Sequence, residues 1–271
     1  MPDDDQTPET ALSTVKVAVV TGAARGIGRA ITEKFLNEGW RVAMLDIDGA
    51  TLSQTAASLS NREDSLSAFE GDVADAGGVQ CAIDQIFKDW GRIDALVNNA
   101  GVAVFKPLLE TSQAEWDRVL AVNLGGPFIC VQACAPVMIA GDGGAIVNIA
   151  SISGLRASTL RVAYGTSKAG LQHLTKQQAA ELGPVGVRVN AVAPGPVDTA
   201  MAKKVHSPEI RADYHDAIPL NRYGLESEIA EAVFFLCSDK ASYINGQTLA
   251  VDGGFDATGI GLPTLRDDSA C

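Results

Sequence analysis

The sequence contains few aromatic residues and few basic ones. Phe, Trp and Tyr make up 6% of its 271 residues, and Lys plus Arg total 21 against 33 for Asp plus Glu, which leaves a formal charge of −12. A nucleic-acid partner needs clustered Lys and Arg to displace counterions from phosphates, and no basic stripe is present in the sequence. The acidic balance therefore argues against nucleic acid, and it favours solubility without indicating a substrate.

Cysteine and histidine are too scattered to predict a disulfide or metal framework. The five cysteines are an odd number and widely spaced, so we expect reduced thiols in a reducing compartment. Cys130 and Cys134 fit core or interface packing. His173, His206 and His215 lack ligand spacing, so no metal is predicted. For His206 and His215, a surface position is favoured over substrate contact.

Long hydrophobic runs and export signals are also lacking. The acidic, polar start MPDDDQTPET is the reverse of a secretion signal or an Arg-rich transit peptide, and we expect residues 1–13 to form a flexible tail. No apolar run approaches the length that spans a membrane. These features predict a cytoplasmic protein with no membrane partner.

Aliphatic residues and glycine, by contrast, are abundant, and short β-branched segments alternate with longer segments of helical periodicity. The predicted strands are 15–21, 42–46, 67–71, 95–98, 145–150, 188–193 and 248–251, and the main predicted helices are 27–38, 79–90, 115–138, 163–182 and 226–237. This alternation predicts an α/β fold: a doubly wound, Rossmann-type parallel sheet of about seven strands with helices on both faces. The length and the absence of repeats favour one domain over residues 14–271.

One segment, residues 196–223, breaks the alternation. It has no clean strand and only a weak helical pattern, and Pro208 and Pro219 interrupt it. Long irregular segments inside a compact domain are usually functional or mobile, and this one follows a strand, where open α/β sheets bind ligands. We therefore expect a substrate lid here. Residues 255–271 are expected to form a tail that reaches either the active site or a neighbouring subunit.

A glycine-rich loop follows the first predicted strand and opens the first predicted helix; its sequence is Thr21-Gly22-Ala23-Ala24-Arg25-Gly26-Ile27-Gly28. Gly22 permits a tight turn, Gly26 lets the backbone approach a pyrophosphate, and Gly28 allows close packing of helix on strand. The helix N-terminus offers N–H groups and positive dipole to the phosphates. In this strand–loop–helix context the pattern predicts a dinucleotide site, which includes Arg25 and Ile27.

The choice between NAD and NADP depends on Asp46 and Arg25. Asp46 ends the second predicted strand, where its carboxylate can accept hydrogen bonds from the adenosine ribose and repel a 2′-phosphate. Arg25 can pair with that phosphate, and at about 4 Å a charge pair contributes roughly 4 kcal/mol at an effective dielectric of about 20. We favour NAD because flexible Arg25 can swing into solvent. Asp72, followed by Val73, either meets the adenine edge or caps the next helix.

Further motifs follow in order along the chain: Asn98-Asn99-Ala100-Gly101, Asn123, Ser151, Tyr164-Gly165-Thr166-Ser167-Lys168, Pro194-Gly195 and Val251-Asp252-Gly253-Gly254. With the glycine loop, they resemble the single-domain branch of the short-chain dehydrogenase/reductase family over residues 15–254. The resemblance implies a nicotinamide cofactor, contacted also by Asn99, Ala100, Gly101, Tyr164, Lys168, Pro194, Gly195, Val197 and Thr199. Asn98 and Asn99 are also interpreted as ties within the sheet, and Asp252 as a turn or interface residue.

Tyr164 and Lys168 carry the predicted acid/base chemistry. They are i and i+4 on one predicted helix and share a face. Free tyrosine titrates near pH ~10 and a neighbouring ammonium favours the phenolate, so we expect Lys168 to lower the pKa of Tyr164. Ser151, at a strand end, can donate to the substrate oxygen. The resemblance implies that Asn123 supports Lys168 and a proton relay, that Lys168 binds ribose, and that Thr199 contacts the nicotinamide carboxamide.

These residues predict an NAD(H)-dependent oxidoreductase that interconverts a secondary alcohol and a ketone. Two alternatives stay open: an NADPH-dependent 3-oxoacyl thioester reductase, which Asp46 disfavours, and a non-catalytic NAD-sensing protein, which would not need Tyr164. A nucleotide-sugar epimerase fits poorly, because the chain lacks an extra C-terminal substrate domain and its glycine spacing differs. The resemblance also implies a homotetramer, with segments 115–138 and 163–182 and the last strand as candidate interfaces.

Overall fold

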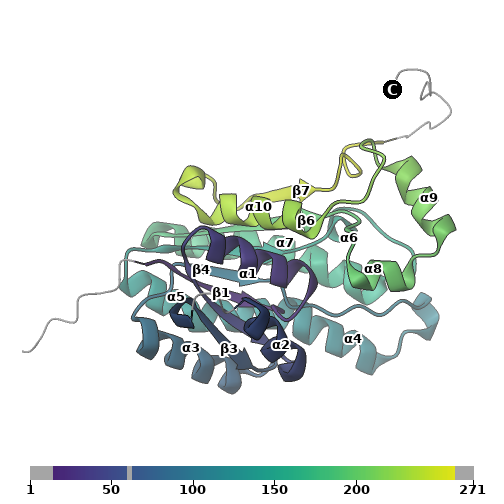
Figure 1. The fold of residues 1–271 in the computed structure, drawn as a ribbon. Helices are drawn as coiled ribbons and strands as arrows, with labels where there is room; N and C mark the ends of the chain where they lie inside the picture. The colour runs from purple at the N-terminus through teal and green to yellow at the C-terminus, as the bar shows by residue number, and fades with distance from the viewer. Residues whose placement is uncertain (1–14, 60–62, 260–271) are drawn as a thin grey trace, which may run out of the picture.

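Seven parallel strands form one sheet in a computed structural model that describes residues 15–59 and 63–259 (Figure 1). The strands are β1 Val17–Thr21, β2 Arg41–Asp46, β3 Leu66–Glu70, β4 Ala95–Asn98, β5 Gly144–Ile149, β6 Val187–Pro194 and β7 Thr248–Val251. Each predicted strand is present, and the Rossmann-type fold is confirmed. The predicted tail at residues 1–13 and residues 260–271 of the predicted C-terminal tail lie outside the described residues.

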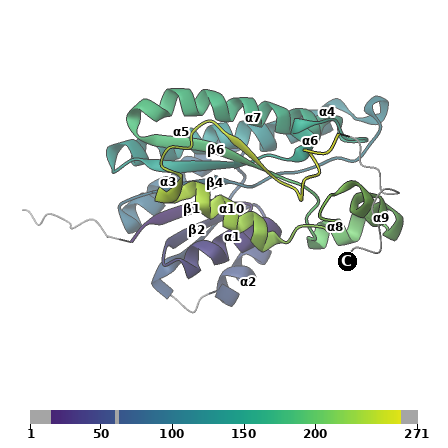
Figure 2. The same ribbon diagram turned by 90° about the horizontal axis from the view of Figure 1, so that it is seen from above.

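Helices cover both faces of the sheet, as Figure 2 shows, with α1 and α10 on one side and α5 and α7 on the other. The helices are α1 Gly26–Asn37, α2 Gly49–Leu59, α3 Ala76–Trp90, α4 Gln113–Leu120, α5 Gly126–Ala140, α6 Ile152–Leu155, α7 Val162–Leu182, α8 Ala200–Val205, α9 Pro208–Ala217 and α10 Glu226–Cys237. Short helical turns complete the chain: η1 Glu63–Ser65, η2 Leu108–Glu110, η3 Ala121–Gly125, η4 Gly183–Val185 and η5 Asp239–Ala241. Parallel strands covered in this way are buried on both faces, which explains their continuous aliphatic sequences.

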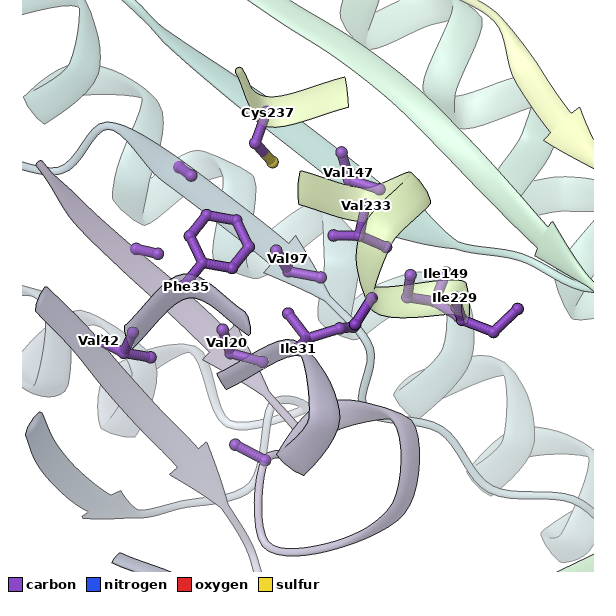
Figure 3. Close-up of a cluster of buried hydrophobic side chains, with 14 of the residues drawn as sticks. Val20, Ile31, Phe35, Val42, Val97, Val147, Ile149, Ile229, Val233 and Cys237 are labelled. Atoms are coloured by element: carbon purple, nitrogen blue, oxygen red, sulfur yellow. The ribbon is translucent and has the colours of Figure 1, made fainter. Parts of the chain in front are cut away.

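The core between the sheet and the pair α1 and α10 consists of interlocking aliphatic side chains around one phenylalanine (Figure 3). Ile31 and Phe35 of α1 and Val233 of α10 are fully buried against Val20 of β1. The Phe35 ring meets the Trp40 ring edge-on, with centroids 5.1 Å apart. Burial of each such side chain contributes about 1.5–3 kcal/mol, and this packing fixes the start of α1 against the end of β1.

The predicted helix 115–138 is part of a helical segment from Gln113 to Ala140 that includes a π-helical turn, η3. Its 28 residues, with a mean hydropathy of 1.5 in the most apolar window, are long and apolar enough to cross a membrane. The expectation that no segment approaches that length is therefore wrong. However, 56% of the window is buried inside the fold, and α5 packs with α3 on one face of the sheet. Packing in the hydrophobic core therefore explains why the helical segment Gln113–Ala140 is apolar.

The segment 196–223 contains two helices, α8 and α9, which corrects the expectation of an irregular lid. The hydroxyl of Ser207 accepts a hydrogen bond from the backbone N–H of Ile210 (3.4 Å) and caps α9. Pro208 occupies the first turn, where its missing N–H leaves no intrahelical bond unmade. Pro208 therefore begins a helix and does not interrupt one.

The strand order β3-β2-β1-β4-β5-β6-β7 creates a crevice at one end of the sheet. The chain continues outward in opposite directions from β1 and from β4, so the connections that follow these neighbouring strands diverge. In open α/β sheets, ligands bind beyond the carboxyl ends of the strands at such a switch point. α8 and α9 lie together at this end of the sheet (Figure 2). Ligand-binding residues are therefore expected in the loops after β1, β2, β4, β5 and β6.

Candidate active site

A cavity of about 660 Å³ lies beyond the carboxyl ends of the strands. This volume is in the range typical of cofactor and ligand sites. Every residue of the predicted site except Gly28 and Asn123 lines it: Gly22, Arg25, Gly26, Ile27, Asp46, Asp72, Val73, Asn99, Ala100, Gly101, Ser151, Tyr164, Lys168, Pro194, Gly195, Val197 and Thr199. The structure therefore brings together residues that are spread over nearly 180 positions of the sequence.

The glycine loop adopts backbone conformations and close contacts that a side chain would prevent. Gly22 and Gly26 have positive φ values of 64° and 59°, a region that glycine adopts without steric cost. A Cβ on Gly28 would lie 2.1 Å from the carbonyl oxygen of Gly22. No side chain caps the N-terminus of α1, which begins at Gly26. Its first N–H groups are thus available to an anion such as a pyrophosphate.

The loop after β4 holds the glycine loop in place. The Nδ2 of Asn99 donates to the carbonyl oxygens of Thr21 and Gly22, both at 3.0 Å. In return, the Thr21 hydroxyl accepts from the backbone N–H groups of Asn99 and Ala100, also at 3.0 Å. The expectation that the Asn98-Asn99 pair ties the sheet together is confirmed, since Nδ2 of Asn98 donates to Asn148 of β5 at 2.8 Å.

Acidic groups gather where β2 ends. The carboxylate of Asp46 accepts from the backbone N–H groups of Ala24 (2.9 Å) and Asp48 (3.0 Å). Arg25 forms an ion pair with Asp48 and a hydrogen bond to the Thr51 hydroxyl (3.1 Å). The side chain of Arg25 is 64% exposed, as expected of an arginine that can swing into solvent, and Asp48 offers it a carboxylate there. Because Arg25 pairs with Asp48, no cation within the described residues forms an ion pair with Asp46.

Asp72 lies at the same end of the cavity and pairs with Arg118 of α4 at 2.8 Å. Its other carboxylate oxygen accepts from the backbone N–H of Ala74 at 3.0 Å. It does not cap the following helix: Asp75 is the N-cap of α3 and accepts from Gly77. That alternative is wrong because three further residues separate Asp72 from the helix. A contact with adenine stays a prediction.

At the opposite end, Tyr164 and Lys168 share one face of α7, as predicted. The Nζ of Lys168 lies 5.8 Å from the Tyr164 ring centroid and donates to the carbonyl oxygen of Ile149 at 2.7 Å. Burial lowers the pKa of Lys168 to about 8. Burial also raises the pKa of Tyr164, while a hydrogen bond from Ser151 and the charge of Arg161 oppose that rise. Burial outweighs these two effects, so the pKa of Tyr164 is raised overall, and the expectation that Lys168 lowers it stays a prediction.

Ser151 follows β5 and is 7% exposed. Its hydroxyl oxygen accepts from the backbone N–H of Ser153 at 3.1 Å, which caps α6. A hydrogen bond between the Ser151 and Tyr164 side chains lowers the pKa of Tyr164 and so favours its phenolate. Ser151 therefore both shapes the local backbone and presents a donor beside the tyrosine.

Asn123 lies in the π-helical turn η3 and is completely buried. Its Nδ2 donates to the carbonyl oxygen of Val102 (2.9 Å) and to the Ser167 hydroxyl (3.0 Å), and its Oδ1 accepts from the N–H of Val102 (2.8 Å). Turns of this type are frequent at functional sites. A Cβ on Gly101 would lie 3.3 Å from Oδ1 of Asn123 and 3.5 Å from Nζ of Lys168. The two side chains flank Gly101, and a link between them stays a prediction.

The loop after β6 closes the cavity. Gly195 packs so tightly that a Cβ there would lie 2.7 Å from Cα of Asp252. Asp252 accepts from the N–H groups of Gly254 and Asp256, at 2.9 and 2.7 Å, so its interpretation as a turn residue is confirmed. Thr199 caps α8 by accepting from the N–H of Ala202 at 3.1 Å, and it also lines the cavity.

The cavity lining also includes residues that were not predicted as site residues, among them Phe105, Arg161, His206 and Tyr214. The expectation of a surface position for His206 is wrong, since its ring stacks on Tyr214 with centroids 5.3 Å apart. Its Nδ1 also lies 3.0 Å from the Tyr223 hydroxyl. A weak signal existed for Arg161, which precedes Tyr164 by three positions and so falls on the same side of a helix. The other three depend on tertiary contacts.

Comparison with known proteins identifies the class. A family model described as enoyl-(acyl carrier protein) reductase matches residues 22–256. D-threitol dehydrogenase of Mycolicibacterium smegmatis is 43% identical over 240 residues, covering 89% of this chain and 92% of that protein. The 3-oxoacyl-[acyl-carrier-protein] reductase FabG of Aquifex aeolicus is 41% identical over 240 residues, covering 88% and 96%. A solved structure described as a candidate gluconate dehydrogenase of Agrobacterium tumefaciens superimposes with a TM-score of 0.86 at 32% identity, covering 92% and 98%.

The chain belongs to the short-chain dehydrogenase/reductase family. It is an oxidoreductase of alcohol and carbonyl groups that works with a nicotinamide cofactor. The non-catalytic alternative is thereby set aside, because the relatives are dehydrogenases and reductases.

Proposed function

We propose that this protein is an NAD(H)-dependent dehydrogenase/reductase that interconverts a secondary alcohol and a ketone, with Tyr164 as general acid/base. The observation that carries the proposal is the convergence of Tyr164, Lys168 and Ser151 at one end of a cavity whose other end is a glycine loop. A tyrosine alone would be a poor base at neutral pH. The hydrogen bond from Ser151 and the charge of Arg161 favour its phenolate.

A bound nicotinamide ring supplies the hydride acceptor in oxidation and the hydride donor in reduction. In oxidation, Oη of Tyr164 takes the proton of the substrate hydroxyl, and in reduction it returns a proton to the carbonyl oxygen. The Ser151 hydroxyl donates to the same oxygen as negative charge develops there. Lys168, with a pKa of about 8, is cationic at neutral pH, which favours phenolate at Tyr164.

The glycine-loop end fits a dinucleotide. The N–H groups at the start of α1 lack a capping side chain, and the positive φ of Gly26 exposes backbone that a pyrophosphate can approach. Gly22 and Asn99 line the same wall. Lys168 would hold the nicotinamide ribose, and Asn123 would support Lys168 from behind.

Asp46 supports NAD over NADP. Each of its carboxylate oxygens accepts one backbone N–H and retains a lone pair for a ribose hydroxyl. A 2′-phosphate about 4 Å away would be repelled by roughly 4 kcal/mol at an effective dielectric of about 20. The pairing of Arg25 with Asp48 removes the cation that would offset this repulsion.

We also propose that the segment 196–223 is a substrate lid, that the protein is a homotetramer, and that it is cytoplasmic. Thr199, Val205, His206 and Tyr214 of the segment 196–223 line the cavity, which supports its role as a substrate cover. Phe128 and Ile139 of α5 and Leu249 of β7 are 48%, 42% and 40% exposed, and such apolar side chains suit the interfaces of a homotetramer. The four cysteines among residues 15–59 and 63–259 are free thiols, which is compatible with the cytoplasm.

A screen of NADH and NADPH oxidation across a carbonyl panel tests the proposal. We expect turnover of at least one ketone, with kcat/KM for NADH at least about tenfold above that for NADPH, since tenfold corresponds to only about 1.4 kcal/mol. A clear preference for NADPH would contradict the cofactor argument, and absence of turnover with every ketone would contradict the proposed reaction. Sedimentation that shows a stable monomer would contradict the tetramer.

The relatives favour one second candidate, an NADPH-dependent 3-oxoacyl thioester reductase. The FabG relative and the description of the matching family model support it, whereas Asp46 opposes it. Acetoacetyl-CoA belongs in the carbonyl panel for this reason. Its reduction with NADPH at a higher kcat/KM than any simple ketone with NADH would favour this candidate.

A further inference from the structure

Three arginines line the cavity, and one of them has no acidic partner among residues 15–59 and 63–259. Arg25 pairs with Asp48 and Arg118 pairs with Asp72. Arg161, at the opposite end, forms no ion pair within the part of the chain that the structure describes. Its contacts are the Ser153 hydroxyl, 3.5 Å from one guanidinium nitrogen, and the Phe105 ring, whose centroid lies 5.0 Å from Cζ.

The backbone just before Arg161 adopts an unfavourable conformation, and contacts with Lys106 hold the start of α7 in place. Leu160, directly before it, has a φ of 60°, a conformation that is unfavourable for a residue with a side chain. The carbonyl oxygen of Leu160 accepts from the N–H of Lys106 at 3.1 Å, and Lys106 and Arg161 form a parallel bridge. Arg161 is the N-cap of α7, three residues before Tyr164. Residues three apart at a helix are neighbours on its surface.

The charges around Arg161 are cationic or neutral. His206, the C-cap of α8, and Lys168 from α7 line the same end of the cavity. Among the described residues, the carboxylates that line the cavity all lie at the glycine-loop end: Asp46, Asp48 and Asp72. Asp198, between β6 and α8, is engaged by Lys203 and Arg211 at 3.2 and 2.9 Å.

The positive charge of Arg161 affects the pKa of Tyr164, the proposed acid/base, and that of His206. Burial raises the pKa of Tyr164, and the charge of Arg161 acts against it. Burial lowers the pKa of His206, and the charge of Arg161 adds to that effect. An unpaired cation inside a cavity is costly unless a partner neutralises it, and a guanidinium matches a carboxylate or sulfonate with two parallel hydrogen bonds.

Resting on the proposed function, we infer that the substrate is a small hydroxy acid or oxo acid whose carboxylate or sulfonate binds Arg161. Its hydroxyl or carbonyl oxygen then meets Tyr164 and Ser151, and the Phe105 ring covers the carbon chain between the two ends. Arg161 is the residue that selects anionic substrates over neutral alcohols.

Matched alcohols test this selection with the full-length protein and NAD⁺. The probes are 3-hydroxybutanoate and 2-hydroxypropane-1-sulfonate against the nearly isosteric, neutral 3-hydroxybutanamide, and 4-hydroxypentanoate against 4-hydroxypentanamide. NADH formation at low ionic strength gives kcat/KM for each. We expect the better anion to exceed its amide by roughly 10- to 100-fold, the range of a hydrogen bond to a charged group. The carboxylate and sulfonate arms show which oxyanion the site prefers.

Variants at Arg161 link the preference to this side chain. Arg161→Gln is expected to bring the acid-to-amide ratio of kcat/KM close to one, mainly through KM, and Arg161→Lys to give an intermediate ratio. Lys176→Gln, which removes an exposed cation from the same helix, is the matched control and should keep the wild-type ratio. Equal or better turnover of the amide at both chain lengths would overturn the inference, as would an equal loss for acid and amide in both Arg161 variants.

A binding measurement separates this inference from the proposed function. Quenching of NADH fluorescence reports acetoacetate and acetoacetamide binding to the protein–NADH complex. Tighter binding of acetoacetate that Arg161→Gln abolishes, with no turnover of any probe, would support the anion site and contradict the proposed reaction. Turnover without anion preference would overturn the anion site alone, and neither turnover nor anion-selective binding would overturn both.

Discussion

The two ends of the cavity carry opposite charge. At the glycine-loop end, defined by Gly22, Gly26, Asp46, Asp48 and Asp72, carboxylates are held by backbone N–H groups or by arginines. At the Tyr164 end, defined by Ser151, Arg161, Tyr164, Lys168 and His206, cations and hydroxyls face the cavity, and no carboxylate of the described residues lines it there. One end is therefore suited to ribose hydroxyls, and the other to an oxygen on which negative charge develops. The following changes should break or sharpen this difference.

Apart from changes at Tyr164 itself, Ser151→Ala should lower kcat more than the other changes at either end. It removes the donor to the reacting oxygen, so kcat should fall roughly 10²- to 10³-fold, while NADH affinity is retained. The loss of the α6 cap should cost about 1 kcal/mol of stability, which urea unfolding measures separately. Ser158→Ala is the control, because its hydroxyl contacts Ser153, 2.9 Å away, and lies outside the cavity lining. Wild-type kcat in Ser151→Ala would show that the hydroxyl plays no part in the reaction.

Lys168→Met should change how stability depends on pH. Burial lowers the pKa of Lys168 from 10.5 to about 8, so between these values the folded chain has lost a proton that the unfolded chain keeps. The free energy of unfolding of the wild type therefore gains about 3 kcal/mol from this group as pH rises through that window. The variant lacks this gain, whereas Lys176→Met, at an exposed site on the same helix, should retain it. Urea unfolding at pH 7, 8, 9 and 10 measures it, and a constant difference between variant and wild type would argue against a buried ammonium.

Gly28→Ala should damage the glycine-loop end. The added methyl would lie 2.1 Å from the Gly22 oxygen and 2.5 Å from Nδ2 of Asn99, so the loop must shift. We expect a loss of about 1–3 kcal/mol in stability and weaker NADH binding by fluorescence titration. Gly77→Ala is the matched control, since its methyl would meet nothing closer than 3.6 Å. Unchanged affinity in Gly28→Ala would place the phosphates elsewhere.

Asp46→Asn should produce the smallest of these effects and the most specific one. It removes the charge that opposes a 2′-phosphate but keeps one acceptor oxygen. The ratio of kcat/KM for NADP⁺ to that for NAD⁺ should rise about tenfold, or about 1.4 kcal/mol. Asp89→Asn removes an equal charge from an exposed site on α3 and should leave the ratio unchanged. If both variants move it equally, overall charge governs the choice and Asp46 does not.

The sequence predicted the sheet and most of the site because both depend on local patterns. β4 and β7 match their predicted bounds, since aliphatic runs bounded by glycine or polar residues leave little choice of register. The glycine loop and the Tyr164–Lys168 pair were predicted because loop geometry and helical spacing follow from neighbouring residues. These features need no knowledge of distant contacts.

The parts that could not be predicted depend on partners far along the chain. Nothing near Arg25 in the sequence indicates that it pairs with Asp48, 23 residues away. His206 enters the cavity because Tyr214 and Tyr223 pack around it. The π-helical turn at Asn123 has no hydrophobic pattern that distinguishes it from the surrounding helix. A proline such as Pro208 looks the same in the sequence whether it ends a helix or begins one.

Tyr164→Phe tests the central claim most directly, because it removes one oxygen and leaves the ring. Turnover of the best substrate and the dissociation constant of NADH should be measured on the same preparation. The account predicts a loss in kcat of roughly 10²- to 10⁴-fold, the usual contribution of a general acid/base, with NADH affinity within about twofold of wild type. Wild-type turnover in this variant would contradict the assignment of Tyr164 as the acid/base.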